Sequence, residues 1–228
     1  KRHHIVNRVL ADILQDPDFK NASFGFLAID AKTGRIISAY NPDMALKPAS
    51  NQKLISTAAV LELYGPEYRF ETGLNYTGFI DTLNHILHGD IIIKGGGDPT
   101  LGSKYFDQTK DKQFLKQWIA DIQNLEVDSI TGSVIADARI YSKDIVPVTW
   151  SWINMGNYFG AGACGLSVYD NYYTIYLNTS GILGDRAKIV NSVPEIPFLV
   201  FDNEVLADSV SGDNTNIFGA PYCNTRYL

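Results

Sequence analysis

The chain has 228 residues, of which 45% are hydrophobic and 19% charged, and its formal net charge is −6. This composition excludes an intrinsically disordered chain and supplies enough apolar material for one large domain or two modest ones. Lysine and arginine are scattered without a basic stripe, so nucleic acid is not an expected partner. No apolar run approaches the roughly 20 residues that a membrane-spanning helix needs. The segment carries no initiator methionine and no signal peptide, so we expect a processed chain or a part of a longer one.

The first forty residues predict a helix followed by a hairpin. Between residues 3 and 15, apolar side chains repeat at a spacing of four in two rows, which is typical of an amphipathic helix. The apolar runs 23–30 and 35–40 are joined by a polar segment ending at Gly34, which can adopt the positive φ of a tight turn. We therefore expect the two runs to pair as antiparallel strands.

A second helix is expected over roughly residues 50–64. Apolar and small side chains recur there at helical spacing, and Gly65-Pro66 ends the run. Pro48 lies just before the start, and Ser50 is suited to the N-cap or the first turn.

The rest of the chain is richer in short strands, which are expected at residues 71–79, 86–94 and 130–137. A third helix is predicted near 111–123, where Phe114, Trp118 and Ile122 share one face. The stretch 163–178 again favours strands. From about residue 179 onward, glycine, proline, aspartate and asparagine dominate, and no elements are predicted. The fold class expected overall is α/β in the broad sense, with helices and strands in an α+β arrangement.

Cysteine and histidine form no metal-binding pattern. Cys164 and Cys223, the only cysteines, could be a disulfide, two buried thiols or residues without a role, and buried thiols are the plainer interpretation. The pairs His3-His4 and His85, His88 have no cysteine or acidic cluster beside them, so surface or hydrogen-bonded imidazoles are expected. We expect no metal and no cofactor.

Ser50 and Lys53 form a Ser-x-x-Lys motif at the start of the second predicted helix. Residues three apart project from one helical face, so the Lys53 amine can reach the Ser50 hydroxyl. A serine hydroxyl becomes a good nucleophile only when a neighbour takes its proton. A neutral lysine can do so, but its pKa would have to fall from about 10.4 to about 7 through burial or nearby positive charge. This pattern predicts Ser50 as nucleophile and Lys53 as general base.

The tetrad alone does not establish that chemistry. Chance predicts about 0.7 such matches in a chain with this many serines and lysines. The alternative is an N-cap serine followed by a solvated lysine. The three consecutive glycines at 95–97 could suggest a phosphate-binding loop, but the residues that bind phosphate in such loops do not accompany them. A tight turn between strand and loop is expected there instead.

The motif lies within five ordered blocks that together resemble one family. Ser50 and Lys53 stand in a Pro-Ala-Ser-Asn-Gln-Lys stretch, followed by Leu-Tyr-Gly-Pro-Glu-Tyr-Arg-Phe and then by Gly-Asp-Ile-Ile-Ile-Lys-Gly-Gly-Gly-Asp-Pro-Thr-Leu. The blocks occupy residues 48–53, 63–70, 89–101, 130–137 and 150–171. This order resembles the class C low-molecular-mass penicillin-binding proteins, the D-Ala-D-Ala carboxypeptidase/endopeptidase family. An unrelated α/β protein with a chance tetrad is the remaining alternative.

The resemblance implies a division into two parts. Residues 1–70 would be the N-terminal limb of a penicillin-binding, β-lactamase-like catalytic domain, made of a helix, a β-hairpin and the Ser-x-x-Lys helix. Residues 71–228 would belong to an inserted, strand-rich domain that is incomplete at its C-terminal end. The implied partners are peptidoglycan stem peptides ending in D-Ala-D-Ala and β-lactams, and the implied location is the periplasm or cell envelope. The oligomeric state stays open.

Two further motifs of such enzymes, Ser-x-Asn and Lys-Thr/Ser-Gly, do not follow Ser50 in the required order. Residues 32–34 spell Lys-Thr-Gly but precede Ser50, in the predicted hairpin turn. Residues 169–171 spell Tyr-Asp-Asn but belong to the fifth block, so neither stretch is expected to be catalytic. We therefore expect a serine carboxypeptidase or endopeptidase in the full-length protein. The alternative for these 228 residues is an incomplete fragment or paralogue that contacts the cell wall without turnover.

Overall fold

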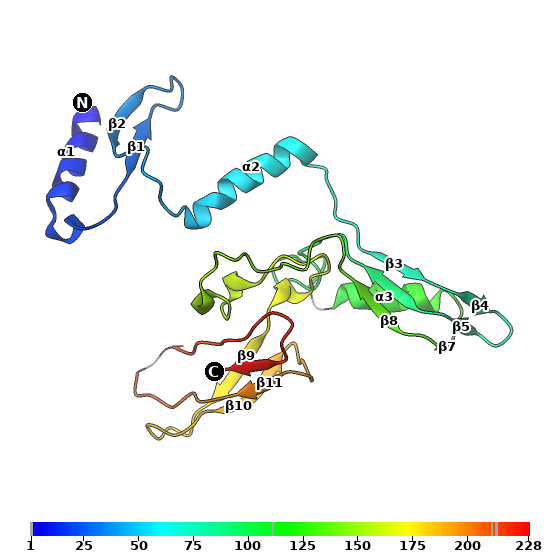
Figure 1. The fold of residues 1–228 in the computed structure, drawn as a ribbon. Helices are drawn as coiled ribbons and strands as arrows, with labels where there is room; N and C mark the ends of the chain where they lie inside the picture. The colour runs from blue at the N-terminus through cyan, green and yellow to red at the C-terminus, as the bar shows by residue number, and fades with distance from the viewer. Residues whose placement is uncertain (1, 111, 211, 213) are drawn as a thin grey trace. The chain divides into compact units, whose positions relative to one another are not determined.

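The computed structural model describes residues 2–110, 112–210, 212 and 214–228. The chain divides into two compact units, Lys1–Tyr68 and Arg69–Leu228. The division falls close to the boundary expected between residues 70 and 71. Whether the units are a catalytic limb and an insertion stays a prediction. The structure mixes helices and strands in both units (Figure 1).

The first unit begins with helix α1, Arg2–Gln15, which confirms the helix predicted over residues 3–15. One of its two apolar rows is covered, with Leu10 buried and Leu14 half-buried. In the other row, Ile5 and Val9 are exposed and Ile13 is half-buried. A short 3₁₀ turn, Pro17–Phe19, follows, and the side chain of Asp16 caps it by accepting the N–H of Asp18.

Strands β1, Phe26–Ile29, and β2, Ile36–Tyr40, form the predicted antiparallel hairpin. The Asp30 carboxylate closes the turn by accepting the N–H groups of Lys32 at 3.0 Å and Thr33 at 2.9 Å. Gly34 has a φ of 69°, a left-handed conformation that costs glycine little. The Lys-Thr-Gly at 32–34 is therefore a hairpin turn, as predicted.

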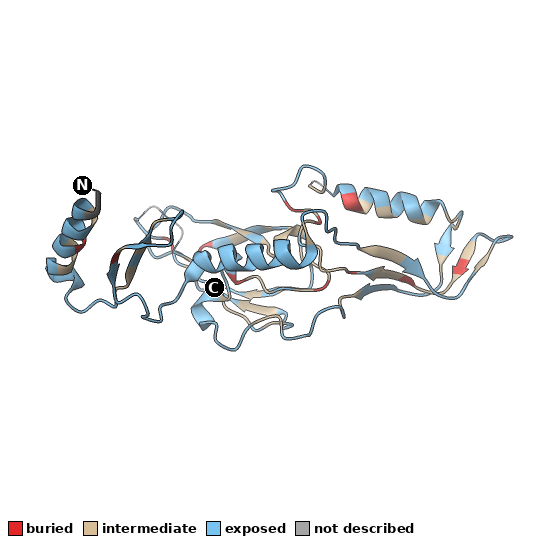
Figure 2. Cartoon of the chain, turned by 90° about the horizontal axis from the view of Figure 1, so that it is seen from above, coloured by how far each residue is buried: buried red, intermediate tan, exposed pale blue. Residues whose placement is uncertain are grey.

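The second predicted helix is present, but its first turn is a separate 3₁₀ turn, Ala49–Asn51, that leads into α2, Gln52–Tyr64. Gly65, with a φ of 75°, ends α2, and its N–H donates to the Leu61 carbonyl at 3.0 Å. Every residue of α2 is exposed (Figure 2).

In the second unit, each of the three long strands predicted from the sequence is divided into two. The resulting three-stranded sheets are ordered β3-β6-β8 and β4-β5-β7. Their strands are β3 Gly73–Tyr76, β4 Phe79–Asp81, β5 Ile86–His88, β6 Ile91–Lys94, β7 Ser129–Ile130 and β8 Val134–Asp137. Leu87, in the middle of β5, and Ile91, the first residue of β6, are fully buried and belong to the core of this unit.

The strand breaks coincide with glycines at 78, 89 and 132. A Cβ on Gly78 would lie 1.9 Å from the His88 carbonyl oxygen, and one on Gly132 would lie 2.4 Å from the Gly89 carbonyl oxygen. The three backbones thus approach too closely for any larger residue, and the ladder is interrupted where they do.

Helix α3, Gln113–Gln123, confirms the third predicted helix. The Phe114 side chain is buried, and its ring meets Trp118 edge-on at 5.0 Å and Tyr169 at 5.9 Å. The predicted face of Phe114, Trp118 and Ile122 is the less exposed face of the helix.

The C-terminal part holds two strand pairs that the sequence did not fully predict (Figure 1). Strands β9, Thr174–Asn178, and β10, Lys188–Val193, are antiparallel, whereas β11, Val200–Asp202, and β12, Thr225–Tyr227, are parallel. The strand expected over 163–178 is confirmed only in its last five residues. The rest of that stretch consists of loops and the 3₁₀ turn Tyr169–Asn171. Two more 3₁₀ turns lie before it, Trp152–Asn154 and Tyr158–Gly160.

Candidate active site

Ser50 and Lys53 lie together at the entry to α2. The Lys53 amine donates a hydrogen bond from Nζ to the Ser50 hydroxyl oxygen over 3.2 Å. The 3₁₀ turn places the two residues on one side of the chain, as the i, i+3 spacing predicts. A proton can therefore pass directly between hydroxyl and amine whenever the amine is neutral.

The backbone just before Ser50 is held in an uncommon conformation. Ala49 has a φ of 46°, which places a residue with a Cβ in the left-handed region. Such a residue costs about 1–2 kcal/mol relative to an ordinary helical conformation. The turn is stabilised by the N–H of Asn51, which donates to the Pro48 carbonyl at 3.0 Å. The conformation of Ala49 thus sets the position of Ser50 relative to α2.

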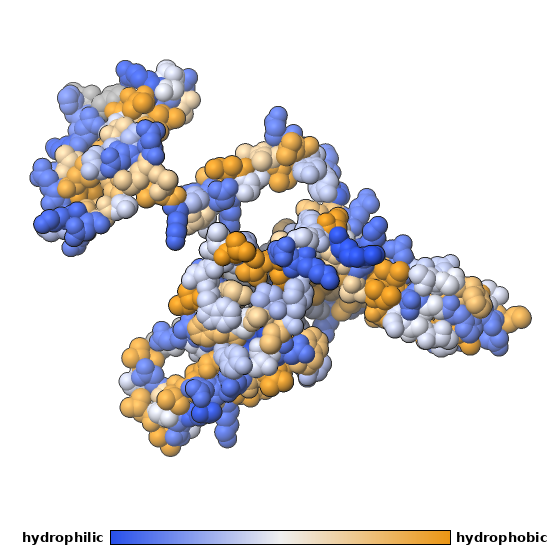
Figure 3. Space-filling view, viewed as in Figure 1, coloured by the Kyte–Doolittle hydropathy of each residue, from blue (hydrophilic) through white to orange (hydrophobic). Residues whose placement is uncertain are grey.

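The first unit leaves this pair open to water. Both side chains are exposed, so the described residues of the unit provide no burial around the Lys53 amine. Helix α2 has apolar side chains on every side, although polar residues such as Ser56 and Glu62 lie between them, and Leu54 is 73% and Leu63 75% exposed. Hydrophobic side chains accordingly appear on the surface at this helix (Figure 3). A helix with large apolar side chains on every side is ordinarily packed against other elements, so we expect further parts of the protein to cover α2.

The Tyr-Asp-Asn stretch at 169–171 has structural contacts of its own within the second unit. The Asn171 side chain donates to the Gly162 carbonyl at 2.6 Å, and the Tyr169 N–H donates to the Leu101 carbonyl at 2.8 Å. All three residues have positive φ. These contacts organise a tight loop.

The glycines at 95–97 allow backbone packing at the end of β6. A Cβ on Gly95 would lie 2.2 Å from the Gly165 carbonyl oxygen, and one on Gly96 would lie 2.0 Å from that of Glu71. The predicted tight turn is not present at these three glycines. Instead, the Gly95 N–H donates to the Asp137 carbonyl at 2.9 Å and the Gly97 N–H to the Gly165 carbonyl at 2.8 Å, and Gly97 has a φ of 79°.

The cysteines and the described histidines have ordinary surroundings. Cys164 and Cys223 are free thiols, the first half-buried and the second exposed, so the interpretation as two buried thiols is wrong. The His85 ring nitrogen Nδ1 lies 2.8 Å from the Glu126 carbonyl oxygen, and the His88 ring packs against Phe79 at 4.9 Å. These two imidazoles are hydrogen-bonded or packed, as predicted. His3 lies outside the described side chains. Among the helices that the structure describes, none has the length and apolar character needed to cross a bilayer.

Comparison with protein families identifies the chain. The model of the D-Ala-D-Ala carboxypeptidase 3 (S13) family matches residues 6–227. The chain belongs to this family. Its members are penicillin-binding D-Ala-D-Ala carboxypeptidases that hydrolyse peptidoglycan in the cell envelope, which confirms the resemblance carried by the five motif blocks.

Individual relatives agree with this assignment. The chain is 26% identical over 204 residues to the D-alanyl-D-alanine carboxypeptidase DacB of Haemophilus influenzae, covering 90% of this chain and 38% of the relative. It is 25% identical over 215 residues to a D-alanyl-D-alanine carboxypeptidase of an Actinomadura species, covering 92% and 38%. The chain thus spans about two-fifths of the length of these relatives.

The fold is also similar to that of solved structures. The crystal structure of penicillin-binding protein 4 from Haemophilus influenzae matches with a TM-score of 0.68 at 23% identity, covering 96% of this chain and 46% of that one. A second structure of that protein, in complex with a β-lactam, matches with a TM-score of 0.56 at 21% identity.

Proposed function

We propose that Ser50 is the nucleophile, and Lys53 the general base, of a serine-type D-Ala-D-Ala carboxypeptidase that acts on peptidoglycan peptides and is inhibited by β-lactams. The observation that carries this proposal is the 3.2 Å hydrogen bond between the two side chains at the entry to α2. Family membership supports the substrate class. The same chemistry would serve a cross-link endopeptidase.

The proposed reaction has two steps. The Ser50 hydroxyl oxygen attacks the carbonyl carbon between the two D-alanines while neutral Lys53 takes the hydroxyl proton. The C–N bond then breaks, the departing amine of D-alanine takes a proton, and an ester to Ser50 remains. Water hydrolyses this ester in the second step. Backbone N–H groups, including that of Ser50, would stabilise the oxyanion, and the start of α2 favours negative charge there.

The activity would belong to a longer protein that includes these residues, with residues 1–70 as one limb of its catalytic domain and residues 71–228 as part of an insertion. The chain spans about two-fifths of the length of its relatives, and α2 has large apolar side chains exposed on its surface. Covering elements would bury the Lys53 amine and thereby favour its neutral form. The proposed location is the periplasm or cell envelope.

A fluorescent penicillin tests the proposal in the full-length protein. We expect a covalent adduct in the unsubstituted protein and none in the Ser50→Ala variant. Ser56→Ala is a matched control, since Ser56 lies on the same helix and its hydroxyl donates to the Gln52 carbonyl at 3.1 Å. An adduct that persists in Ser50→Ala would overturn the proposal.

A second function is favoured for the 228 residues by themselves. Neither Ser-x-Asn nor Lys-Thr/Ser-Gly follows Ser50 in this sequence, and Ser50 and Lys53 are both exposed. These observations favour a protein that binds the cell wall without catalysing a reaction. We expect the isolated chain not to hydrolyse a D-Ala-D-Ala peptide. Hydrolysis that Lys53→Ala abolishes would exclude this second function.

A further inference from the structure

The second unit contains a cavity of about 630 Å³ that the proposed reaction does not use. Its lining comes from stretches of chain that are far apart in sequence, including residues 104–105, 155–162, 171–177 and 215–228. A cavity of this size is within the range of small-molecule sites, which are about 300–1,000 Å³.

The charge of the lining opposes that of the chain. Lys104 and Arg226 line the cavity, whereas the described part of its wall includes no aspartate or glutamate. The chain as a whole has a net charge of −6. Two cationic side chains, with no acidic side chain among the described lining residues, favour an anionic ligand.

Lys104 is positioned by two aromatic rings. Its Nζ lies 5.2 Å from the centre of the Tyr105 ring and 5.6 Å from that of Tyr172, distances at which a cation interacts with a ring face. A hydrogen bond with the Tyr172 side chain raises the pKa of Lys104, and the charge interaction with Tyr105 raises it further. The amine is therefore a fixed positive charge at neutral pH.

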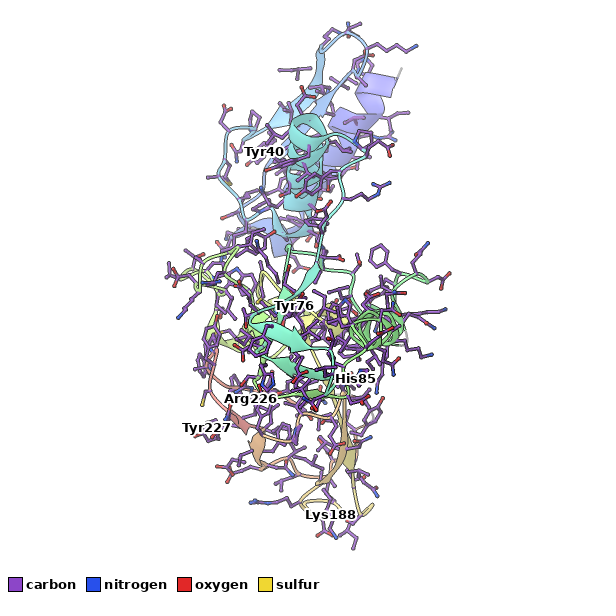
Figure 4. The ribbon with its side chains drawn as sticks, turned by 90° about the vertical axis from the view of Figure 1, so that its right-hand side faces the viewer. Tyr40, Tyr76, His85, Lys188, Arg226 and Tyr227 are labelled. Atoms are coloured by element: carbon purple, nitrogen blue, oxygen red, sulfur yellow. The ribbon has the colours of Figure 1, made fainter. Side chains whose placement is uncertain are left out.

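Arg226 lies on strand β12 (Figure 4), and backbone carbonyls bind its side chain. Its Nη1 donates to the carbonyl oxygens of Cys223 and, at 2.9 Å, of Thr225. A Cβ on Gly219 would lie 2.6 Å from the Arg226 Cδ, so glycine allows the side chain to pack against this segment. The Arg226 side chain also forms a hydrogen bond with the Tyr173 side chain, which lines the same cavity. A guanidinium has five N–H donors, so Arg226 can make these contacts and still donate to a carboxylate.

Tyrosines supply the remainder of a recognition surface. Tyr158, Tyr172, Tyr173 and Tyr222 also line the cavity. Burial raises the pKa of the Tyr173 hydroxyl, which therefore stays protonated as a donor. Tyrosine rings combine an apolar face with a polar tip, and this suits a sugar ring that bears amide and hydroxyl groups.

We propose that this cavity is a second binding site for peptidoglycan, which takes a muropeptide through its sugar ring and a free carboxylate. The choice of ligand rests on the proposed function, because the polymer on which that enzyme would act combines amino-sugar rings with acidic peptides. The two cations bind the carboxylate, and the tyrosine faces contact the sugar.

Calorimetric titration of the 228-residue chain with N-acetylmuramoyl-L-alanyl-D-glutamate tests the proposal. This probe has a sugar ring and carboxylates but no D-Ala-D-Ala, so it does not report on Ser50. We expect saturable binding that Lys104→Gln weakens by about tenfold, the loss of one charge-assisted hydrogen bond. Lys116→Gln, which removes the same charge from the exposed surface of α3, should leave the affinity unchanged.

Three outcomes would overturn this second site: no binding of the probe, equal losses in both lysine variants, or competition by inorganic phosphate at the concentration at which the probe itself binds. The last would show a general anion site. The Ser50 adduct assay separates this proposal from the enzymatic one. Adduct formation without probe binding removes only the cavity proposal, and Lys104-dependent binding without an adduct removes only the enzymatic one.

Discussion

The Lys53 amine and the Ser50 hydroxyl are joined by a 3.2 Å hydrogen bond across a single turn at the start of α2. Both groups come from one short stretch of chain, so their contact depends on local backbone geometry. This arrangement lets the pair form in the first unit before any covering element is in place.

Replacing Lys53 should remove the proposed base and leave the proposed nucleophile, Ser50, in place. General-base catalysis contributes about 10²–10⁴-fold, so Lys53→Ala should slow acylation of the full-length protein by a penicillin by at least about 100-fold. The rate can be followed by stopped-flow fluorescence. Lys47→Ala, at another exposed lysine shortly before the motif, is the control and should acylate at the unsubstituted rate. Equal rates in Lys53→Ala and the control would exclude Lys53 as the base.

The left-handed backbone at Ala49 should tolerate glycine but not a branched side chain. Ala49→Gly keeps the turn because glycine adopts a positive φ freely. Ala49→Val should force the backbone out of this region and misplace Ser50, slowing acylation by at least about tenfold. Ala58→Val, a matched change within α2, should have a much smaller effect. A normal rate in Ala49→Val would show that the turn does not depend on this conformation.

The backbone approach at Gly96 should be sensitive to one methyl group. A Cβ there would lie 2.0 Å from the Glu71 carbonyl oxygen, so Gly96→Ala should lower the free energy of unfolding of the second unit by about 1–3 kcal/mol. Gly73→Ala provides the comparison, because its added Cβ would meet only the Asn75 side-chain amide, at 3.3 Å. Urea denaturation of the two variants gives the difference. Similar losses would contradict the close-packing explanation.

The pair of Asp137 and Arg139 should make stability depend on acid pH. The Arg139 guanidinium donates to the Asp137 carboxylate at 2.8 and 2.7 Å, and these bonds, with that of the Arg139 N–H, hold the pKa of Asp137 well below its usual value. A carboxylate whose pKa is lower in the folded than in the unfolded chain stabilises the folded state. This stabilisation is complete above the unfolded pKa of about 3.9 and is lost as the pH falls from there through the folded pKa.

Asp137→Asn should therefore lower the urea midpoint at pH 7, and its difference from the unsubstituted chain should shrink below about pH 4. Asp144→Asn removes the same charge at an exposed position and should show a smaller difference at pH 7. A difference for Asp137→Asn that is constant from pH 7 to pH 3 would rule out the carboxylate as its source.

Local signals explain most of what the sequence predicted. The helical spacing of residues 3–15 and the stop at Gly65 depend on neighbours in the chain, and the corresponding helices are present. The contact between Ser50 and Lys53 was predictable for the same reason, because the two residues lie three positions apart within one helical turn.

Long-range contacts explain what was missed. The strand predicted over 71–79 divides at Gly78 because the His88 backbone lies against it, and periodicity contains no information about that approach. Strands β11 and β12 pair in parallel although more than 20 residues separate them. Lys104 and Arg226 share a cavity although they are 122 positions apart, and neither lies in a recognisable motif.

Peptide mass spectrometry of the full-length protein after reaction with benzylpenicillin tests the central claim most directly. The account predicts that the peptide containing residue 50 gains the mass of one intact penicillin, with fragmentation placing the ester on Ser50. An adduct on a different residue, or no adduct in folded full-length protein, would contradict it.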